Sequence, residues 1–348
     1  MTQVSDVTVS PGLAPMEAKL VDALPAGADW QFEPKWDGFR CLLFRDGDAV
    51  ALQSKSGKPL SRYFPEIVAA ALALDIRKFV LDGELIIALG GRMSFDALQM
   101  RLHPAESRIK RLARETPAQM ILFDCLQDES GSLIDRPLVE RREMLERLHA
   151  SFGAAIFQLS PYTNDPAIAQ HWLDTAGSAL DGVVAKKRSD VYRPGERAML
   201  KIKLLRTADC VVGGFRYASK RREVGSLLLG LYDGDGKLNH VGFSSAIPAA
   251  ERPALTARLE GLVQPPGFTG NAPGGPSRWS TDRSADWRPL RPELIAEVRY
   301  DQVTGDRFRH GTKFLRWRPD KAPQQCTMEQ LQPEVPPAEL ARVLKLAV

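Results

Sequence analysis

Cysteine is scarce in this chain of 348 residues, and the few cysteines lie far apart. The four are Cys41, Cys125, Cys210 and Cys326, and none belongs to a CxxC pair. This spacing argues against a zinc site and against a disulfide framework, because both need cysteines grouped at short intervals. Isolated cysteines are typical of a reducing compartment, so we expect a cytoplasmic protein.

Long apolar runs and a strong charge of one sign are also missing. No stretch approaches the roughly 20 apolar residues that a membrane-spanning helix needs. The segment Met1–Glu17 lacks the basic flank and apolar core of a secretory signal. The formal net charge is only +4, from 47 basic and 43 acidic residues. We therefore expect no membrane partner, and any binding of nucleic acid must be argued from local clusters of charge.

The chain is too long for one typical domain, and its pattern changes near residue 206. From Glu33 to Leu205, short strand-like runs alternate with helical ones. This alternation predicts an α+β domain over residues 1–206, whose first dozen residues form a mobile tail. Residues 207–348 hold about five strand-like runs, which predicts an all-β domain of the OB barrel type.

The expected elements can be placed individually. In the first domain we expect strands at residues 38–44, 49–53, 79–89, 119–126 and 182–186. The first two would form a hairpin around Asp46-Gly47. A helix should run to Leu148, with Asp135 as its N-cap and Pro137 in its first turn. In the second domain we expect strands at residues 209–217, 226–232, 238–244, 293–300 and 314–318.

The most distinctive local feature is the segment Glu33–Arg40, in which Lys35 comes just before an Asp-Gly pair. A lysine at the opening of a buried hairpin can direct its amine into a cleft beneath the sheet. An amine in such a place can serve as a covalent nucleophile. Taken alone, the segment is equally compatible with a surface lysine in a loop.

Carboxylates occupy apolar runs at two further places. Asp82 and Glu84 flank a glycine within one run, and Asp181 leads the apolar stretch 182–186. Buried strands rarely carry acids unless a cation meets them. Because Mg²⁺ is bound by one or two carboxylates together with phosphates and waters, these acids could hold a divalent cation. The alternative for each acid is a cap or turn residue.

Basic residues alternate with apolar ones in two predicted strands. Lys201 and Lys203 would share one face, since side chains alternate along a strand. Two adjacent ammonium groups repel each other unless a polyanion lies between them, although the outer face of an edge strand is the alternative. Arg316 and Arg318 repeat the pattern, and arginine can bind phosphate through two parallel hydrogen bonds. A solvated basic strand end is the alternative there.

These segments follow one another in a fixed order. The set comprises Lys35-Trp36-Asp37-Gly38, Ser54-Lys55-Ser56-Gly57, Asp82-Gly83-Glu84, Phe123-Asp124, Asp181–Lys186, Lys201–Lys203 and Arg318–Lys321. It resembles the collinear motifs of the covalent nucleotidyltransferases: ATP-dependent DNA ligases, RNA ligases and mRNA capping enzymes. The resemblance covers residues 17–330. With the segments Pro137–Arg142 and Gln325–Leu331, the chain is most similar to the short bacterial C-type DNA ligases.

The resemblance implies an ATP-grasp-like adenylation domain followed by an OB-fold barrel. It implies an ATP-dependent DNA ligase that seals nicks in duplex DNA through a lysyl-AMP intermediate and a DNA-adenylate. The implied cofactors are ATP and Mg²⁺ or Mn²⁺, and the implied partner is nicked double-stranded DNA. It further implies a role in DNA repair beside repair polymerases, a monomer, and a location in the bacterial cytoplasm at the nucleoid.

The resemblance also implies a role for individual residues. Those expected to be catalytic are Lys35, Asp37 and Arg40, with Lys35 attacking the α-phosphorus of ATP. Those expected to bind the nucleotide are Glu33 and Phe123 at the adenine, Glu84 at the ribose, Ser54 and Lys55 near the ribose and the DNA 5′-phosphate, Arg40, Lys201 and Lys203 at the α-phosphate, and Arg318 and Lys321 at the pyrophosphate. Asp181, with Glu84, is expected to hold the metal. Phe123 could equally be a residue of the core.

Two residues depart from the common pattern of the family. Lys55 stands where an arginine is usual, which keeps the charge but loses the bidentate fork. Asp181 stands where glutamate is common, and its side chain is one methylene shorter. Two rival functions stay open: an RNA ligase or GTP-using capping enzyme of the same superfamily, and a non-catalytic OB-fold binding module.

Overall fold

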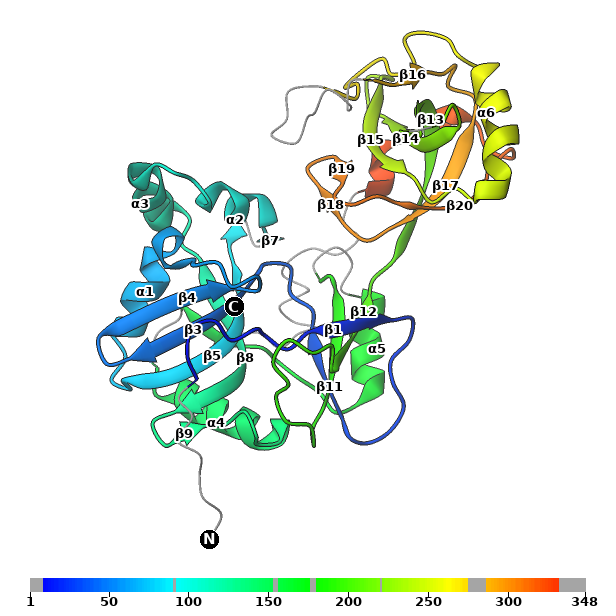
Figure 1. Ribbon diagram of the computed structural model, residues 1–348. Helices are drawn as coiled ribbons and strands as arrows, with labels where there is room; N and C mark the ends of the chain where they lie inside the picture. The colour runs from blue at the N-terminus through cyan, green and yellow to red at the C-terminus, as the bar shows by residue number, and fades with distance from the viewer. Residues whose placement is uncertain are drawn as a thin grey trace. The chain divides into compact units, whose positions relative to one another are not determined.

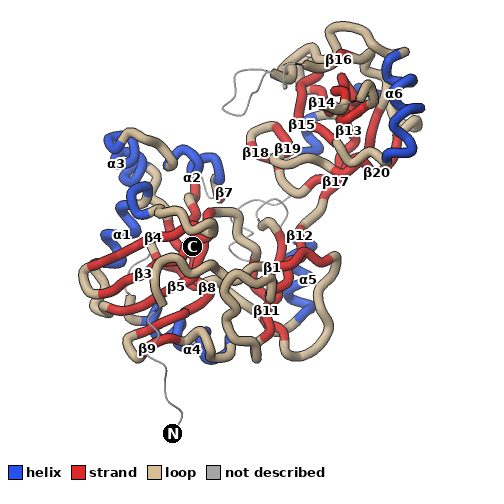
Figure 2. The backbone as a smooth tube through the Cα atoms, viewed as in Figure 1, coloured by secondary structure: helices blue, strands red, loops and turns tan. Residues whose placement is uncertain are grey.

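The computed structural model describes residues 9–89, 92–152, 156–175, 180–219, 221–274 and 286–331 (Figure 1). They fall into two compact units, of which the first ends at Leu204 and the second begins at Leu205. In each unit the strands lie at the centre and the helices outside them (Figure 2). Within this described part of the chain, no helix is both long and apolar enough to cross a membrane.

The described part of the first unit contains two main sheets and a short two-stranded one. The strands of the main sheets are β1 (Ala18–Val21), β2 (Trp30–Pro34), β11 (Gly182–Lys187) and β12 (Met199–Lys203) in the first sheet, and β3 (Phe39–Asp46), β4 (Ala49–Ser54), β5 (Lys78–Ile86), β8 (Gln119–Asp128), β9 (Gly131–Ser132) and β10 (Phe157–Leu159) in the second. The first sheet has the order β1-β12-β11-β2, and the second has the order β10-β8-β5-β3-β4 with β9 beside β8. The predicted strands are confirmed to within a few residues, except that 79–89 divides into β5 and the short β6 (Ala88–Leu89), which pairs with β7 (Arg92–Met93).

The described residues of this unit form five α-helices: α1 (Pro65–Leu72), α2 (Phe95–Arg101), α3 (Glu106–Glu115), α4 (Leu138–Ala150) and α5 (Pro166–Thr175). Helix α4 packs on β8 and β10, and α5 packs on β2 and β11. The second sheet buries an aromatic and aliphatic core that includes Phe64, Phe79 and Leu81. A separate cluster around Phe32, Trp172 and Val183 joins α5 to the first sheet.

The predicted cap of α4 is wrong. The residue before the helix is Pro137, which has no side-chain capping bond, and Asp135 lies outside the helix. The first amides of the helix are satisfied by distant carbonyls instead. Leu138 N donates to Asp190 O at 2.9 Å, and Val139 N donates to Arg188 O at 3.1 Å. Because a tertiary contact satisfies these donors, no local cap is needed.

The predicted mobile tail is also wrong for the residues that can be described. Residues 1–8 lie outside the described part of the chain, but Val9 is 6% exposed and belongs to a buried cluster. Val9 N donates to Gln127 Oε1 at 2.6 Å, and Gly12 N donates to Gln53 Oε1 at 2.6 Å. Both glutamines are buried side chains of the second sheet, so this segment is held in place.

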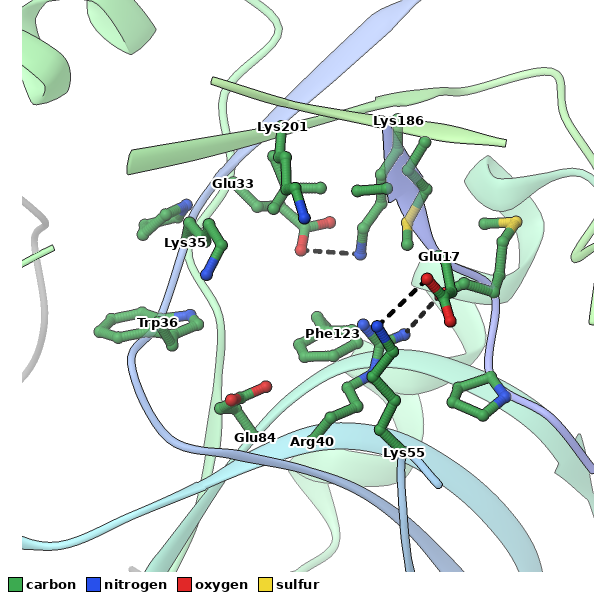
Figure 3. A pocket seen from close by; sticks show the side chains of 16 residues that line it. Glu17, Glu33, Lys35, Trp36, Arg40, Lys55, Glu84, Phe123, Lys186 and Lys201 are labelled. Atoms are coloured by element: carbon green, nitrogen blue, oxygen red, sulfur yellow. Dashed lines mark hydrogen bonds and ion pairs between the residues drawn. The ribbon is translucent and has the colours of Figure 1, made fainter. Parts of the chain in front are cut away.

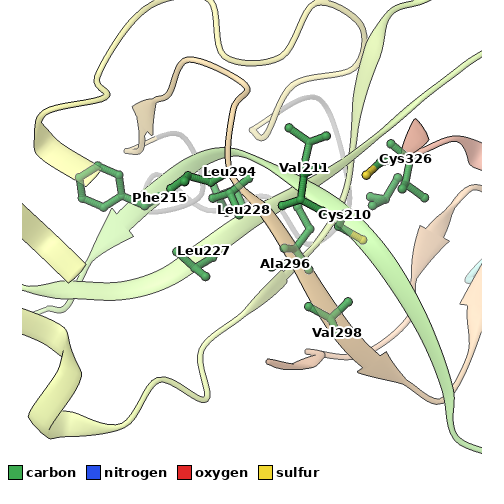
Figure 4. Packing of buried hydrophobic residues seen from close by; sticks show 14 of the residues in the cluster. Cys210, Val211, Phe215, Leu227, Leu228, Leu294, Ala296, Val298 and Cys326 are labelled. Atoms are coloured by element: carbon green, nitrogen blue, oxygen red, sulfur yellow. The ribbon is translucent and has the colours of Figure 1, made fainter. Parts of the chain in front are cut away.

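The second unit is built on one curved antiparallel sheet. Its elements are β13 (Arg206–Tyr217), β14 (Val224–Tyr232), β15 (Leu238–Ser244), α6 (Arg252–Glu260), β16 (Arg288–Pro289), β17 (Ile295–Tyr300), β18 (Val303–Thr304), β19 (Arg307–Phe308) and β20 (Lys313–Trp317). The order is β15-β14-β13-β17-β20, and all five predicted strands are confirmed. Apolar side chains of β13, β14 and β17 form its core (Figure 4). A bridge between Ser244 and Thr312 joins the end of β15 to the start of β20, so the edges of the sheet approach each other.

The expectation of an all-β second domain is wrong in one respect, because α6 belongs to this unit. Only Thr256 and Leu259 of this helix are buried. Helices are recognised in a sequence by an apolar stripe with a period of 3.6 residues. Two buried positions do not make such a stripe, and the sequence therefore did not reveal the helix.

Candidate active site

A pocket of the first unit lies between its two sheets, with a cavity of about 200 Å³. The residues that line it are Pro15, Met16, Glu17 and Ala18 from the N-terminal segment, Glu33, Pro34, Lys35, Trp36, Val184, Lys186, Met199 and Lys201 from or next to the first sheet, and Arg40, Lys55, Glu84 and Phe123 from or next to the second. Figure 3 shows the amines of Lys35, Lys186 and Lys201 facing the side of the pocket that carries Arg40 and Glu84. The pocket thus gathers most of the predicted site residues, although they lie far apart in the sequence.

Lys35 enters this pocket from the end of β2, and its backbone is fixed opposite Asp181. Lys35 N donates to Gly182 O at 2.8 Å, and Asp181 N donates to Lys35 O at 3.0 Å. The Lys35 amine forms an ion pair with the Asp181 carboxylate. Gly182 has φ of +137°, and a Cβ there would collide with the carbonyl of Ile202 on β12. The Asp-Gly pair is therefore required for the close approach that places this acid beside the lysine.

Asp181 is the described acid best suited to a divalent cation. Its side chain is 5% exposed, and Oδ1 is buried without a hydrogen-bond partner. Lys203 Nζ lies 3.8 Å from this oxygen. Among the described residues, no group of three or more His, Cys, Asp or Glu side chains could hold a metal. One orphaned carboxylate oxygen fits Mg²⁺ or Mn²⁺ that takes its remaining ligands from phosphates and water, but not an ion held by protein alone.

Arg40 lies on β3 and is held by a buried acid. Its Nε and Nη2 atoms each donate to the Asp82 carboxylate at 2.6 Å, and Asp82 is fully buried. Burial alone would lower the pKa of Arg40, but the charge and hydrogen bonds of Asp82 raise the pKa above its ordinary value. The guanidinium lies 4.5 Å from the centre of the Phe123 ring. Arg40 is therefore a permanent cation at a fixed place in the wall of the pocket.

Lys186 is a buried cation of the pocket, and sequence reasoning did not include it among the site residues. Its Nζ donates to Glu33 Oε2 at 2.8 Å and lies 4.4 Å from the centre of the Phe123 ring. Gln31 Nε2 donates to the other oxygen of Glu33 at 2.8 Å. Phe123 is 7% exposed, so its ring contacts two cations at the wall of the pocket. The position of Lys186 at the end of an apolar strand was the available signal.

Glu84 and Lys201 have displaced pKa values in this setting. Burial raises the pKa of Glu84 to about 7, although the positive charges of Arg40 and Lys35 oppose the shift. Burial also lowers the pKa of Lys201, and the nearby charges of Lys35, Lys203 and Lys55 lower it further. The carboxyl of Glu84 can thus change its charge near neutral pH, and the lysines repel one another. Shifted pKa values and clustered positive charges are typical of a functional site that binds an anion.

The predicted site residues Ser54 and Asp37 do not line the pocket. The Ser54 hydroxyl accepts from Lys58 N at 3.0 Å, which gives this side chain a role in its own turn. Asp37 lies close enough to Glu84 to raise the pKa of that carboxyl. Lys55 lines the pocket, and its amine lies 3.1 Å from Glu17, another residue that sequence reasoning missed.

Arg318 and Lys321 belong to the second unit, where both contact Asp209. Arg318 Nη1 lies 3.0 Å from each oxygen of Asp209, and Lys321 Nζ lies 2.7 Å from Oδ2. Arg318 also donates to Asp320, and this hydrogen bonding lowers the pKa of Asp320 to about 2. The two residues predicted to bind pyrophosphate therefore contact the same carboxylate.

Comparison with known proteins identifies the family. The model of the ATP dependent DNA ligase domain matches residues 11–203, and the model of the ATP dependent DNA ligase C terminal region matches residues 220–321. The first match covers more than half of the chain. The chain belongs to the ATP-dependent DNA ligase family. DNA ligase C2 of Mycolicibacterium smegmatis is 46% identical over 342 residues, which cover 94% of this chain and 96% of that relative.

Two further members of the ligase family extend the comparison. The multifunctional non-homologous end joining protein LigD of Mycobacterium bovis is 30% identical, and the match covers 91% of this chain but 40% of that protein. A structure from a structure-function study of Lig E DNA ligases has a TM-score of 0.54 and 17% identity, covering 89% of this chain and 100% of that one. At this identity the likeness concerns the fold alone.

Proposed function

We propose that this ATP-dependent DNA ligase seals nicks in duplex DNA through an AMP group carried on Lys35. The observation that carries the proposal is the Lys35 amine in a pocket with Arg40, Lys186 and Lys201. A phosphoryl group entering such a pocket meets cations that are already in place. Preorganised charge of this kind stabilises the negative charge that develops during attack at phosphorus.

The first step is attack by the uncharged Lys35 amine on the α-phosphorus of ATP. A P–N bond forms, the bond from the α-phosphorus to the bridging oxygen breaks, and pyrophosphate leaves. Arg40, Lys201 and Lys203 neutralise the α-phosphate, while Glu33 and Phe123 border the adenine and Glu84 contacts the ribose. Asp37 is the third residue of the proposed catalytic set, and its charge raises the pKa of Glu84. Ser54 and Lys55 lie near the ribose and the DNA 5′-phosphate.

Two further steps complete the sealing. The 5′-phosphate at the nick attacks the lysyl-AMP phosphorus, which releases Lys35 and forms a DNA-adenylate. The 3′-hydroxyl then attacks the 5′-phosphate, and AMP leaves. Bound at Asp181, Mg²⁺ or Mn²⁺ would supply Lewis-acid neutralisation of phosphate oxygens. The orphaned Oδ1 atom of Asp181 supports this assignment.

We assign the two compact units to an ATP-grasp-like adenylation domain, residues 1–206, and an OB-fold domain, residues 207–348. The five-stranded order of the second unit and the Ser244–Thr312 bridge between its edge strands support a barrel of this type. A role in DNA repair is part of the proposal, since the LigD relative is named for end joining. A monomeric enzyme that works beside repair polymerases completes it.

The test is sealing of a nicked DNA duplex with a 5′-phosphate by the purified protein, ATP and Mg²⁺ or Mn²⁺. We expect sealing by the wild type and none by Lys35→Ala. Lys110→Ala removes an exposed lysine of α3 and should seal normally. Sealing of nicked RNA alone would indicate an RNA ligase, and labelling with GTP in place of ATP would indicate a capping enzyme. A protein that binds DNA but takes no AMP would be a binding module.

A further inference from the structure

One wall of the pocket comes from residues 9–18, which we call the strap. Its first part is attached to the second sheet. Besides the bonds of Val9 and Gly12 to buried glutamines, Gln53 Nε2 donates to Leu13 O at 2.8 Å. Its last residue, Ala18, begins β1 and pairs with Met199 on β12 of the first sheet. The strap therefore connects both sheets across the pocket, and residues 15–18 line it.

Met16, in the middle of this wall, belongs to a closed ring of hydrogen bonds. Met16 N donates to the Tyr192 hydroxyl at 2.9 Å, and this hydroxyl donates to Asp82 Oδ2 at 2.7 Å. Asp82 accepts from Arg40, whose Nη2 atom returns to Met16 O at 3.4 Å. Met16 and Arg40 line the pocket, whereas Tyr192 and Asp82 stand behind it. Tyr192 lies 176 residues from Met16 and 110 from Asp82.

The Tyr192 hydroxyl is the link between the strap and the arginine. Tyr192 is 2% exposed, so water does not readily replace its hydrogen bonds. Its hydroxyl accepts one proton and donates another, and both roles are used in the ring. Without the hydroxyl, Met16 N would lose its acceptor and the buried Asp82 would lose a donor. A buried polar group without a partner is unfavourable, and a strap free to move avoids leaving Met16 N in that state.

We propose that Tyr192 is a positioning residue for ATP, which holds the strap and Arg40 in the geometry that receives the nucleotide. The inference rests on the proposed function of the pocket. Tyr192 touches neither the amine nor the cavity, and it acts through Met16 and Asp82. Ordering these groups before ATP arrives raises affinity, because the bound state then loses less conformational freedom.

This role predicts a specific kinetic pattern for Tyr192→Phe. If the receptive arrangement falls to about a tenth of the population, the apparent dissociation constant rises about tenfold. Saturating ATP restores the arrangement, so the maximal rate of lysyl-AMP formation should change much less than KM. A variant that merely unfolds in part would lose rate in proportion to the folded fraction and keep its KM.

The experiment measures the initial rate of AMP transfer from labelled ATP to the full-length protein over a range of ATP concentrations. Tyr192→Phe should raise KM for ATP about tenfold. Gln53→Leu removes the hydrogen bonds that attach Gly12 and Leu13 of the strap to β4, and it should also raise KM for ATP. The matched control is Tyr217→Phe, which removes a tyrosine hydroxyl that donates to Glu260 in the second unit and should leave KM unchanged.

The outcomes separate the inference from the function beneath it. An active wild type with unchanged KM in both Tyr192→Phe and Gln53→Leu overturns the positioning role and leaves the ligase proposal standing. A rise in the control as large as in Tyr192→Phe also overturns it. A wild type that takes no label at all overturns the proposed function, and the role of Tyr192 falls with it.

Discussion

At the scale of single residues, buried acids paired with basic side chains dominate the pocket and its surroundings. Asp82 meets Arg40, Glu33 meets Lys186, and Asp181 meets Lys35. A buried charge is tolerated when it is paired and hydrogen-bonded, and each of these acids contacts a basic side chain. In Asp181, however, one oxygen has no hydrogen-bond partner. The pairs fix where the cations stand, and this oxygen marks where a further cation fits.

Glu84 gives a prediction about pH. Burial raises its pKa to about 7, so the side chain is protonated below this pH and ionised above it. If the carboxylate contacts the ribose or a metal, the rate of lysyl-AMP formation should rise as the pH increases through about 7. The measurement is this rate as a function of pH for the wild type and for Glu84→Gln. The variant should be slower and should lose the inflection; an inflection of equal size in the variant would assign the titration to another group.

The sequence could point to residues in or beside the pocket where these lie within a short motif. Lys35 and Arg40 share one segment, and Asp181 leads another, so local pattern was sufficient to select them. Lys186 was not selected although it ends the Asp181–Lys186 segment, whereas Tyr192 was missed because its partners lie more than a hundred residues away. Hydrogen bonds over such separations leave no periodicity or spacing in the sequence.

At the scale of elements, a buried ion pair ties helix α4 to the second sheet. Arg141 Nε and Nη2 donate to the Asp124 carboxylate of β8 at 2.8 and 2.9 Å. The two side chains are 1% and 2% exposed. Arg141 Nη1 also donates to the carbonyls of Arg136 and Asp190, so the helix start is held by the same side chain. The start of α4 is thus held by this ion pair and not by the predicted Asp135 cap. The sequence pattern did not indicate the pair.

Removal of one partner should therefore destabilise the first unit. Arg141→Met leaves the Asp124 charge buried and unpaired, which costs about 3–5 kcal/mol in comparable pairs. Urea denaturation of the wild type and the variant measures the difference. The double variant Asp124→Leu/Arg141→Met should recover most of the loss, because no buried charge remains. If the single variant is as stable as the wild type, the pair does not hold the helix.

The whole molecule divides its proposed site residues between two units. The change of pattern near residue 206 suggested two domains, and the compact units divide between Leu204 and Leu205. The longer strands of both units could be predicted because their apolar runs are short and bounded by turns, whereas β1, β2 and β10 were not predicted. Helix α6 could not, since only two of its residues are buried. Arg318 and Lys321 could be selected from their motif, but their shared contact with Asp209 is a tertiary feature.

The proposed roles of Arg318 and Lys321 predict a difference between steps. Pyrophosphate leaves only in the first step, so Arg318→Ala should slow lysyl-AMP formation by about tenfold or more, as expected for loss of a charge-stabilising group. Sealing of a nick that already carries the 5′-adenylate should change far less. Arg316→Ala, two residues earlier on β20 and paired with Glu297, is the control. Equal losses in both assays would contradict a role confined to pyrophosphate.

The central claim is tested most directly by locating the AMP on the protein. Purified protein is incubated with ATP and Mg²⁺ or Mn²⁺, digested, and the modified peptide is sequenced by mass spectrometry, with Lys35→Ala in parallel. We predict AMP on Lys35 in the wild type, none in the variant, and loss of the AMP when nicked DNA is added. AMP on another residue, or an unmodified Lys35 in protein that seals DNA, would contradict the account.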